Sequence, residues 1–498
     1  MNVNPITRLD YPDPDVIRVE DTYYMVSTTM HFMPGCEILQ SFDLVHWEHA
    51  TYVYETLDHT DAQQLKSGQN IYGQGMWAAS LRYHEGRFYI CFVANDTRKT
   101  YLYTSEKIDG PWKKQLIEGF YHDGSLLFDE DGRNYIVYGN DEIWITELNE
   151  DLTAPKKDGL HRLLVSDHKN PELGYEGSHI QKINGYYYIF LIHSLRDRWM
   201  RTEACFYSDS LEGEFTGGDV LCDDRGYCGQ GVAQGGIVDT PDGKWYAMLF
   251  QDSGAVGRIP ILVPVTWKDH FPVFGQNGHV PEEIEVHSTR PGYIYQPLVG
   301  SDDFCNGLLP RWQFNHDPDP RYYHLDALQG TYTITTREVC TELTQAVNTL
   351  TQRMSYPSCA AEVTVDASAL KEGDVAGLCA FQSCYAAVGI TKHHGKYEVL
   401  MLDKKEDGIL DMTERTVVES HQMDFRLEAD FCNMKDEARC YYRVNKGDWL
   451  PIGTVHKLYF KLDHFTGCRF GLFCYAAEKT GGSACFRDFK YYDVDEIS

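Results

Sequence analysis

The segment DGRNYIVY, residues 131–138, decides the fold, because variants of it recur along the first half of the chain. Each copy opens with an acidic or amide side chain, usually followed by glycine, and then reaches a tyrosine and an apolar run. Gly beside Asp or Asn favours a tight turn, and aromatic and β-branched residues favour strands. Since a shorter apolar stretch precedes each copy, we predict five β-hairpins. The other copies are EDTYYMVS (20–27), EGRFYICF (85–92), NGYYYIFL (184–191) and DGKWYAML (242–249).

The spacing of the copies predicts how the hairpins assemble. Their tyrosines are separated by 65, 46, 53 and 58 residues, which is room for a four-stranded sheet in each interval. Most copies are also followed by a further strand-like stretch that ends near an aromatic residue. Five such sheets are typical of a β-propeller. We therefore predict an all-β chain with a five-bladed β-propeller over residues 1–300. The repeated tyrosines are Tyr24, Tyr89, Tyr135, Tyr188 and Tyr246.

A common register links five residues that stand upstream of these tyrosines. They lie twelve residues before each tyrosine, or eleven in the first copy, where the turn is one residue shorter. All five therefore stand at the entrance of the innermost strand of a blade, and in a propeller those entrances converge on the axis. The prolines of YPDPD fix the backbone and cannot donate to a ladder, so they hold the first of these residues stiffly. The five are Asp13, Trp77, Asp123, Glu176 and Gln234.

Three carboxylates in one pocket indicate a particular chemistry. Mutual repulsion and burial raise at least one pKa, so an acid and a base can coexist near neutral pH. Two carboxyl groups that flank a bond are the arrangement that cleaves glycosides. Trp77 would suit the apolar face of a sugar, and Arg258, at the start of a strand of the last blade, would balance the acids or bind a hydroxyl. The alternatives are a calcium site, acids that only cap turns, a core role for Trp77 and a surface role for Arg258.

Composition limits the possible partners. The chain has 498 residues, which favours two domains, and a net charge of −29, which argues against nucleic acid or an anionic membrane surface as a partner. A neutral sugar is compatible with this charge. The start of the chain shows no signal-peptide pattern, so we expect a cytoplasmic protein. The fifteen cysteines include no CxxC, which predicts reduced thiols. One pair, Cys222 and Cys228, is a candidate for a small bridge.

A second domain is predicted over residues 301–498. Strand-like segments such as GTYTITT, AAVGITK and CRFGLFCYA follow one another there, which is typical of an antiparallel β-sandwich. The segment WQFNHDPDPRYYHL (312–325) is either part of the active-site rim or the first strand and turn of the sandwich.

Over residues 4–295 the chain resembles glycoside hydrolase family 43, whose members are five-bladed propellers that act on xylose- and arabinose-containing glycans. The carriers are NPITRLDYPDPDVIRVEDTYYMVST, GMWAASLRYHEGRFYICF, HDGSLLFDEDGRNYIVYG, YEGSHIQKINGYYYIF and GGIVDTPDGKWYAML. The second domain resembles the concanavalin-like C-terminal sandwich of some members, which packs on the propeller and can lend a loop to the active-site rim.

The resemblance implies roles for individual residues. Asp13 matches the general base, Glu176 the general acid, and Asp123 the third acid that orients the acid and modulates its pKa. The family is inverting, so the two carboxyl groups of base and acid should lie roughly 6.5–9.5 Å apart. The positions that shape the sugar subsite are matched by Phe32, Trp77 and Arg258.

Two departures from the family pattern stand out. Gln234 takes the place of a central His that often lies near a cation, so we expect no required cofactor, with calcium as the alternative. The stretch WAAS replaces a common W-A-P pattern at the outer subsite.

The sequence thus predicts an inverting exo-acting β-xylosidase or α-L-arabinofuranosidase that takes short oligosaccharides. The alternatives are an endo-acting arabinanase, a retaining propeller glycosidase, a non-catalytic sugar-binding propeller, and a propeller whose acids only hold calcium.

Overall fold

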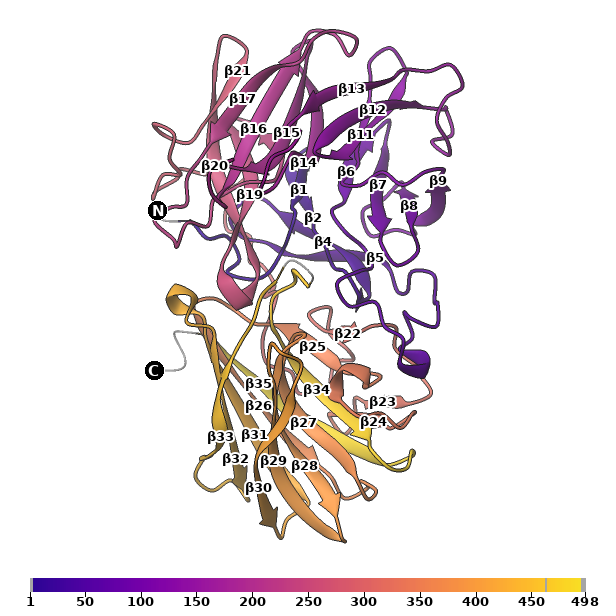
Figure 1. The fold of residues 1–498 in the computed structure, drawn as a ribbon, viewed down its shortest axis with the longest axis vertical. Coiled ribbons are helices and arrows are strands. Elements are labelled where there is room, and N and C mark those ends of the chain that lie inside the picture. The colour runs from indigo at the N-terminus through magenta and orange to yellow at the C-terminus, as the bar shows by residue number, and fades with distance from the viewer. Residues whose placement is uncertain (1–2, 462–463, 494–498) are drawn as a thin grey trace.

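The computed structural model describes residues 3–461 and 464–493. It has two lobes, stacked along the long axis of the molecule (Figure 1). Within the described residues the lobes consist of strands and turns, and the helical content is four single-turn 3-10 segments. These are η1 (Lys66–Gly68), η2 (Gly254–Val256), η3 (Leu343–Gln345) and η4 (Cys432–Met434). None of the helices in that part of the chain is long and apolar enough to cross a membrane.

The first lobe is the predicted propeller, and its described residues form five four-stranded antiparallel sheets. Blade 1 contains β1 (Asp15–Val19), β2 (Thr22–Val26), β4 (Gly35–Ser41) and β5 (Glu48–Tyr54). Blade 2 contains β6 (Ser80–His84), β7 (Arg87–Ala94), β8 (Lys99–Ser105) and β9 (Lys113–Ile117). Blade 3 contains β10 (Ser125–Phe128), β11 (Asn134–Asn140), β12 (Glu142–Leu148) and β13 (His161–Ser166). Blade 4 contains β14 (Glu176–Ile183), β15 (Tyr186–Ser194), β16 (Arg201–Ser208) and β17 (Thr216–Leu221). Blade 5 contains β18 (Ile237–Asp239), β19 (Trp245–Asp252), β20 (Arg258–Lys268) and β21 (Phe271–Phe274).

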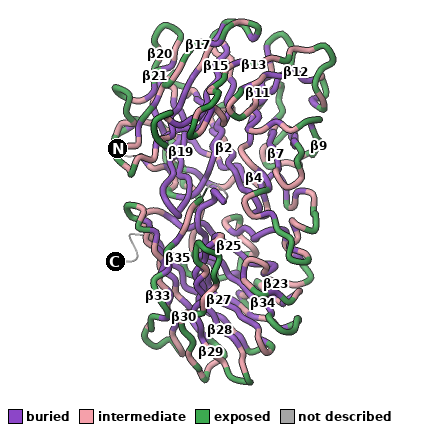
Figure 2. The backbone as a smooth tube through the Cα atoms, viewed as in Figure 1, coloured by how far each residue is buried: buried purple, intermediate pink, exposed green. Residues whose placement is uncertain are grey.

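The repeated signature forms the hairpin between the first two strands of every blade. In blade 1 Val19 pairs with Thr22 across the turn, and in blade 4 Ile183 pairs with Tyr186. Each repeated tyrosine lies on the second strand, where alternate residues point into the packing between neighbouring blades. The second strands β2, β7, β15 and β19 are largely buried, and the centre of the upper lobe is mostly purple in Figure 2. The predicted hairpins are thus confirmed in all five copies.

The second lobe is a β-sandwich, as predicted. Its described residues form two sheets whose facing side chains make one large apolar core. The first sheet contains β22 (Gln313–Asn315), β25 (Leu350–Arg353), β34 (Arg469–Ala476), β27 (Asp374–Phe381), β28 (Tyr385–His393), β29 (Lys396–Lys404) and β30 (Leu410–Val418). The second contains β23 (Tyr323–Asp326), β24 (Thr331–Thr335), β35 (Ser483–Asp493), β26 (Ser358–Asp366), β31 (Gln422–Asp430), β32 (Glu437–Val444) and β33 (Leu450–Lys457).

The two lobes share a sheet and a buried carboxylate. A propeller strand, β3 (Phe32–Met33), pairs with β22 and extends the first sandwich sheet. The segment 312–325 therefore supplies strands β22 and β23 of the sandwich, and β22 reaches the propeller. The carboxylate of Asp10 accepts hydrogen bonds from the backbone N–H of Arg258 and of Gly467, at 2.7 Å each. A propeller strand and a sandwich loop are thus fixed to one buried group.

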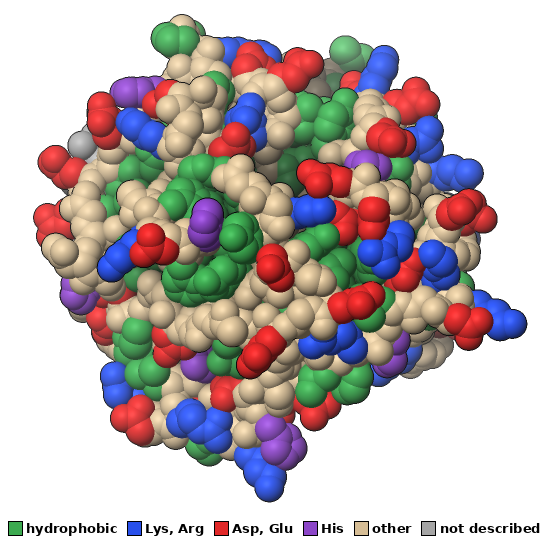
Figure 3. Space-filling model, turned by 90° about the horizontal axis from the view of Figure 1, so that it is seen from above, with side chains coloured by type: hydrophobic (Ala, Val, Ile, Leu, Met, Phe, Trp, Pro, Cys, Tyr) green, Lys and Arg blue, Asp and Glu red, His purple; other side chains and the backbone are tan. Residues whose placement is uncertain are grey.

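All fifteen cysteines are free thiols, Cys222 and Cys228 included, so the small bridge does not form in the structure. Charged side chains of both signs are interspersed on the end of the propeller lobe seen in Figure 3. That face shows no continuous basic area.

Candidate active site

The five residues of the common register meet in one cavity of about 220 Å³. Four of them stand just before the first strand of their blade, and Glu176 is the first residue of β14. Arg258, the first residue of β20, joins them. The lining is Asp13, Trp77, Ala78, His122, Asp123, Leu173, Glu176, Gln234, Arg258 and Phe465. Six of the seven predicted site residues are therefore brought together from all five blades.

Phe32, the seventh, does not belong to the lining of this cavity. Its ring is buried beneath the Arg469 guanidinium, whose carbon lies 3.5 Å from the ring centroid. It also packs against His31. The subsite role implied for Phe32 therefore stays a prediction, because β3 directs the residue toward the sandwich.

Three of the entrance residues share an uncommon backbone conformation. The φ angles are 53° for Asp13, 48° for Asp123 and 62° for Gln234, all in the left-handed region. A non-glycine residue held there costs on the order of 1 kcal/mol, and such strain concentrates at functional sites. The same backbone turn thus directs a different polar side chain toward the axis in each of these three blades.

Asp13 is held by two charge-assisted contacts. Thr28 Oγ1 donates to its Oδ2 at 2.6 Å, and Arg258 Nη1 donates to its Oδ1 at 2.8 Å. Arg258 is itself fixed by Asp252, whose Oδ1 lies 3.3 Å from its Nε. Asp13 and Arg258 are both buried, and the charge-assisted hydrogen bonds of Arg258 to Asp13 and Asp252 fix the orientation of the Asp13 carboxylate. The rigid aim expected of YPDPD comes from these contacts together with the prolines.

Glu176 and Asp123 face one another across a histidine. His122 Nε2 lies 3.5 Å from Glu176 Oε2 and 3.5 Å from Asp123 Oδ2. Asn140 Nδ2 donates to Glu176 Oε2 at 2.7 Å, and the backbone N–H of Gly177 donates to Asp123 Oδ2 at 3.0 Å. The cluster therefore fixes both carboxylates from more than one side.

The charges in this cluster set the proton affinities of its members. Burial raises the pKa of Asp123 to about 6, opposed by His122 and reinforced by Glu176 and Asp13. The charge of Asp123, against the effect of burial and with help from Glu176, raises the pKa of His122 to about 9. Burial also pushes the pKa of Glu176 upward, but the nearby His122 ring and its charge, together with the charges of Arg201 and Arg258, outweigh it and the pKa is lowered. One carboxyl of the cavity does have a raised pKa, as predicted, and it is Asp123.

Within the described part of the chain, one group of three His, Cys, Asp or Glu side chains brings its polar atoms within 4.8 Å of one another. That group is His122, Asp123 and Glu176. A protonated His122 already supplies the positive charge that two carboxylates require. The calcium alternative stays a prediction.

Four residues of the lining were not predicted as site residues, and two of them, His122 and Phe465, bring an imidazole and an aromatic ring to the cavity. His122 precedes Asp123 directly in HDGS, so adjacency to a candidate acid was the available signal. Phe465 comes from the sandwich, where no local pattern marks it. Its ring meets Trp77 edge-on at 5.0 Å, and the Arg258 guanidinium lies 4.4 Å from its centroid. The sandwich therefore does contribute to the active-site cavity, as the resemblance implied, through the loop that carries Phe465.

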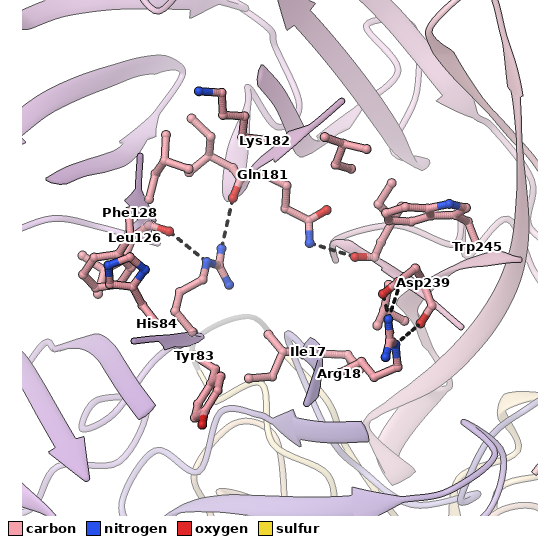
Figure 4. A pocket seen from close by; sticks show the side chains of 17 residues that line it. Ile17, Arg18, Tyr83, His84, Leu126, Phe128, Gln181, Lys182, Asp239 and Trp245 are labelled. Carbon is pink, nitrogen blue, oxygen red and sulfur yellow. Dashed lines mark hydrogen bonds and ion pairs between the residues drawn. The ribbon is translucent and has the colours of Figure 1, made fainter. Parts of the chain in front are cut away.

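The propeller axis is closed below the cavity. Asp15 is buried, and its carboxylate binds Arg82 at 2.8 Å and His179 at 3.1 Å. A second cavity of about 320 Å³ opens at the far mouth of the axis, where Arg18 binds Asp239 and Arg82 binds backbone oxygens (Figure 4). The arginines of this second cavity are thus paired with protein groups. The three carboxylates of the common register lie in the first cavity, which is therefore the candidate active site.

Comparison with known proteins gives consistent results over both lobes. Residues 3–272 match the profile described as Glycosyl hydrolases family 43, and residues 301–492 match that described as Beta xylosidase C-terminal Concanavalin A-like domain. A solved bifunctional GH43-CE protein of Bacteroides eggerthii is 42% identical, with a TM-score of 0.92, over 98% of this chain and 63% of that chain.

Two further relatives match over nearly the whole chain. One is a solved GH43 glycoside hydrolase engineered in its active site to display both endo-xylanase and exo-arabinofuranosidase activity. It is 27% identical, with a TM-score of 0.87, over 99% of both chains. The other is a beta-xylosidase of Formosa agariphila, 27% identical over 99% of this chain and 89% of the relative.

Proposed function

Because the chain belongs to glycosyl hydrolase family 43, we propose that it is an inverting exo-glycosidase that releases terminal xylose or arabinose from short xylan- or arabinan-derived oligosaccharides. The observation that carries this proposal is the convergence of Asp13, Asp123 and Glu176 in one cavity with Arg258. The relatives whose names speak of xylosidase and arabinofuranosidase activity support the substrate class.

In the proposed mechanism Asp13 is the general base. Its carboxylate, oriented by Thr28 and Arg258, takes a proton from a water that attacks the anomeric carbon. Glu176 is the general acid, and it protonates the departing oxygen from the opposite side of the sugar. Asp123 orients Glu176 through the His122 ring and the Gly177 backbone. In an inverting enzyme the base and the acid must lie far enough apart to leave room for the water.

The size and closure of the cavity support exo action. A volume of about 220 Å³ lies below the roughly 300–1,000 Å³ of pockets for drug-sized ligands, so it suits one sugar ring. Beneath it, Asp15, Arg82 and His179 close the axis. A chain that enters from the mouth would therefore present its terminal residue to Asp13 and Glu176.

The first experiment is a rate comparison on nitrophenyl β-xyloside and nitrophenyl α-L-arabinofuranoside. We expect activity on at least one, and a loss of about 10²–10⁴-fold in Asp13→Ala, since that is what a positioned base contributes. Asp21→Ala is the matched control, because this exposed carboxylate pairs with Arg290 outside the cavity. An inactive parent, or equal rates in parent and Asp13→Ala, would favour a non-catalytic sugar-binding propeller.

Product analysis tests the remaining alternatives. Proton NMR of the first product should show the inverted anomer, and retention would reject the mechanism in favour of a nucleophilic carboxylate. With a linear oligosaccharide, single pentoses should appear before any shorter oligomers. Early oligomers would favour an endo-acting enzyme.

A further inference from the structure

His122 lies between the carboxylates of Glu176 and Asp123, and the proposed mechanism gives its imidazole no part in proton transfer. Its Nε2 atom is shielded from solvent and has no hydrogen-bond partner among the described residues, although Glu176 Oε2 and Asp123 Oδ2 lie 3.5 Å away. The ring itself keeps 22% of its surface exposed. One nitrogen is therefore aimed at the acid while another part of the side chain reaches solvent.

Glu176 presents a chemical problem for which this placement matters. A general acid must carry a proton when the glycosidic oxygen arrives. In the structure Asn140 donates an N–H to Glu176 Oε2, and a donor stabilises the ionised form of a carboxyl. His122 and, at longer range, Arg201 and Arg258 act in the same direction and lower the Glu176 pKa. The resting Glu176 is thus a carboxylate near neutral pH and needs a source for the proton it delivers.

We propose that His122 holds this proton in the resting enzyme and passes it from Nε2 to Glu176 Oε2 when the substrate binds, an inference that rests on the function proposed above. In the first step the Nε2–H bond breaks and an Oε2–H bond forms, which leaves His122 neutral. In the second the Oε2–H bond breaks as the proton moves to the departing oxygen together with cleavage of its bond to the anomeric carbon.

The remaining protons are accounted for by the base and by solvent. The attacking water gives one proton to Asp13 and its hydroxyl group to the anomeric carbon, so both products leave neutral. Asp13 then releases a proton to solvent, and His122 regains one through its exposed side. His122 acts here through Glu176 and is therefore a positioning and proton-storing residue.

The surroundings of His122 favour proton storage. The charged groups that raise the pKa of His122 are Asp123 on its own segment, Glu176 on β14 and Asp13 ahead of β1, and all three are carboxylates. The guanidinium of Arg258 lines the same cavity but is paired with Asp13, and the Trp77 ring packs against His122 with its centroid 6.1 Å away. With the charge of Asp123 as the largest cause, the pKa of His122 is raised to about 9, so the imidazolium persists through neutral pH.

The test is the pH dependence of kcat/KM with two leaving groups, on whichever glycoside the parent cleaves. With an alkyl leaving group, which requires protonation, the parent should keep its activity well above pH 7 and lose it near pH 9. In His122→Gln the basic limb should move to about pH 5.5, so that kcat/KM at pH 7.5 falls on the order of 10²-fold. With 2,4-dinitrophenol, which leaves without a proton, the same variant should stay within about threefold of the parent.

Two controls separate the possible failures. His84→Gln removes an imidazole at the far mouth, stacked on Phe128, and should change neither profile. Glu176→Gln should show the same dependence on the leaving group as His122→Gln. If Glu176→Gln shows this dependence on the leaving group and His122→Gln does not, the proton-storing role is overturned while the proposed function stands. If neither variant shows it, the proposed function fails as well.

A result that does not depend on any variant also decides the question. A basic limb of the parent below pH 7 on the alkyl glycoside would overturn the inference even if His122→Gln did not fold.

Discussion

Replacement of Phe465 by Ala tests whether the sandwich takes part in the active site. Phe465 contacts two walls of the cavity, Trp77 at 5.0 Å edge-on and the guanidinium of Arg258 at 4.4 Å. An edge-to-face aromatic pair contributes about 0.5–1.5 kcal/mol, and a cation–π contact contributes about 0.5–2 kcal/mol. Loss of both therefore removes about 1–3 kcal/mol of positioning energy.

At about 1.4 kcal/mol per factor of ten, this energy corresponds to a fall of about 5- to 150-fold in kcat/KM. The assay is initial rates on the better nitrophenyl glycoside. Thermal unfolding of each variant confirms that the sandwich remains folded. Phe465→Leu keeps most of the apolar volume and loses the ring, so it should lie between Ala and the parent. Phe128→Ala, at the far mouth, is the matched control.

The reasoning fails if folded Phe465→Ala keeps kcat/KM within twofold of the parent. It also fails if Phe128→Ala costs as much, since the loss would then report general stability rather than a contact at the cavity.

Two other residues give sharp predictions. Gly177 has a φ of 65°, and a Cβ there would lie 2.7 Å from the Gln234 side chain, so Gly177→Ala should unfold at lower temperature and lose activity. Gly185 is the control, because its φ is 85° and no atom lies within 4 Å of the added Cβ. Gly185→Ala therefore carries only the cost of the left-handed backbone conformation and should keep full activity. Burial raises the pKa of Glu203 well above its ordinary value, so the folded state holds a proton that the unfolded chain releases above about pH 4.5. The stability that the protonated form confers is thus lost as pH rises. In denaturant titrations, Glu203→Gln should have a higher free energy of unfolding than the parent at pH 8 and an equal one at pH 4. An equal difference between the two proteins at both pH values would contradict this.

The strand register of the propeller could be predicted because it is a local property. Each turn-and-tyrosine signature encodes a hairpin by turn chemistry and alternation, and both act over a few residues. A fixed count from the tyrosine back to the strand entrance then selected Asp13, Asp123 and Glu176. The structure places all three in one cavity, since the entrances of inner strands meet on the axis.

The sequence was less informative wherever a residue acts through a distant segment. The subsite role implied for Phe32 stays a prediction, and the structure adds what the sequence did not indicate: β3 pairs with β22 of the sandwich and the ring packs under Arg469. Phe465 lies more than 200 residues beyond Arg258, and no motif marks it. The sequence predicted that at least one carboxyl pKa is raised but not which one. It is Asp123, where burial dominates, while His122 lowers the pKa of Glu176.

The amino-acid sequence by itself determined the five hairpins, the register of the inward-facing carboxylates and the sandwich that follows, since each depends on short-range turn chemistry and side-chain alternation. Only the tertiary structure decided which side chains complete the cavity and where its protons reside. Coulomb interaction and burial depend on distances between segments far apart in the chain, and those distances are fixed only when the blades close around the axis and Asp10 joins the two lobes.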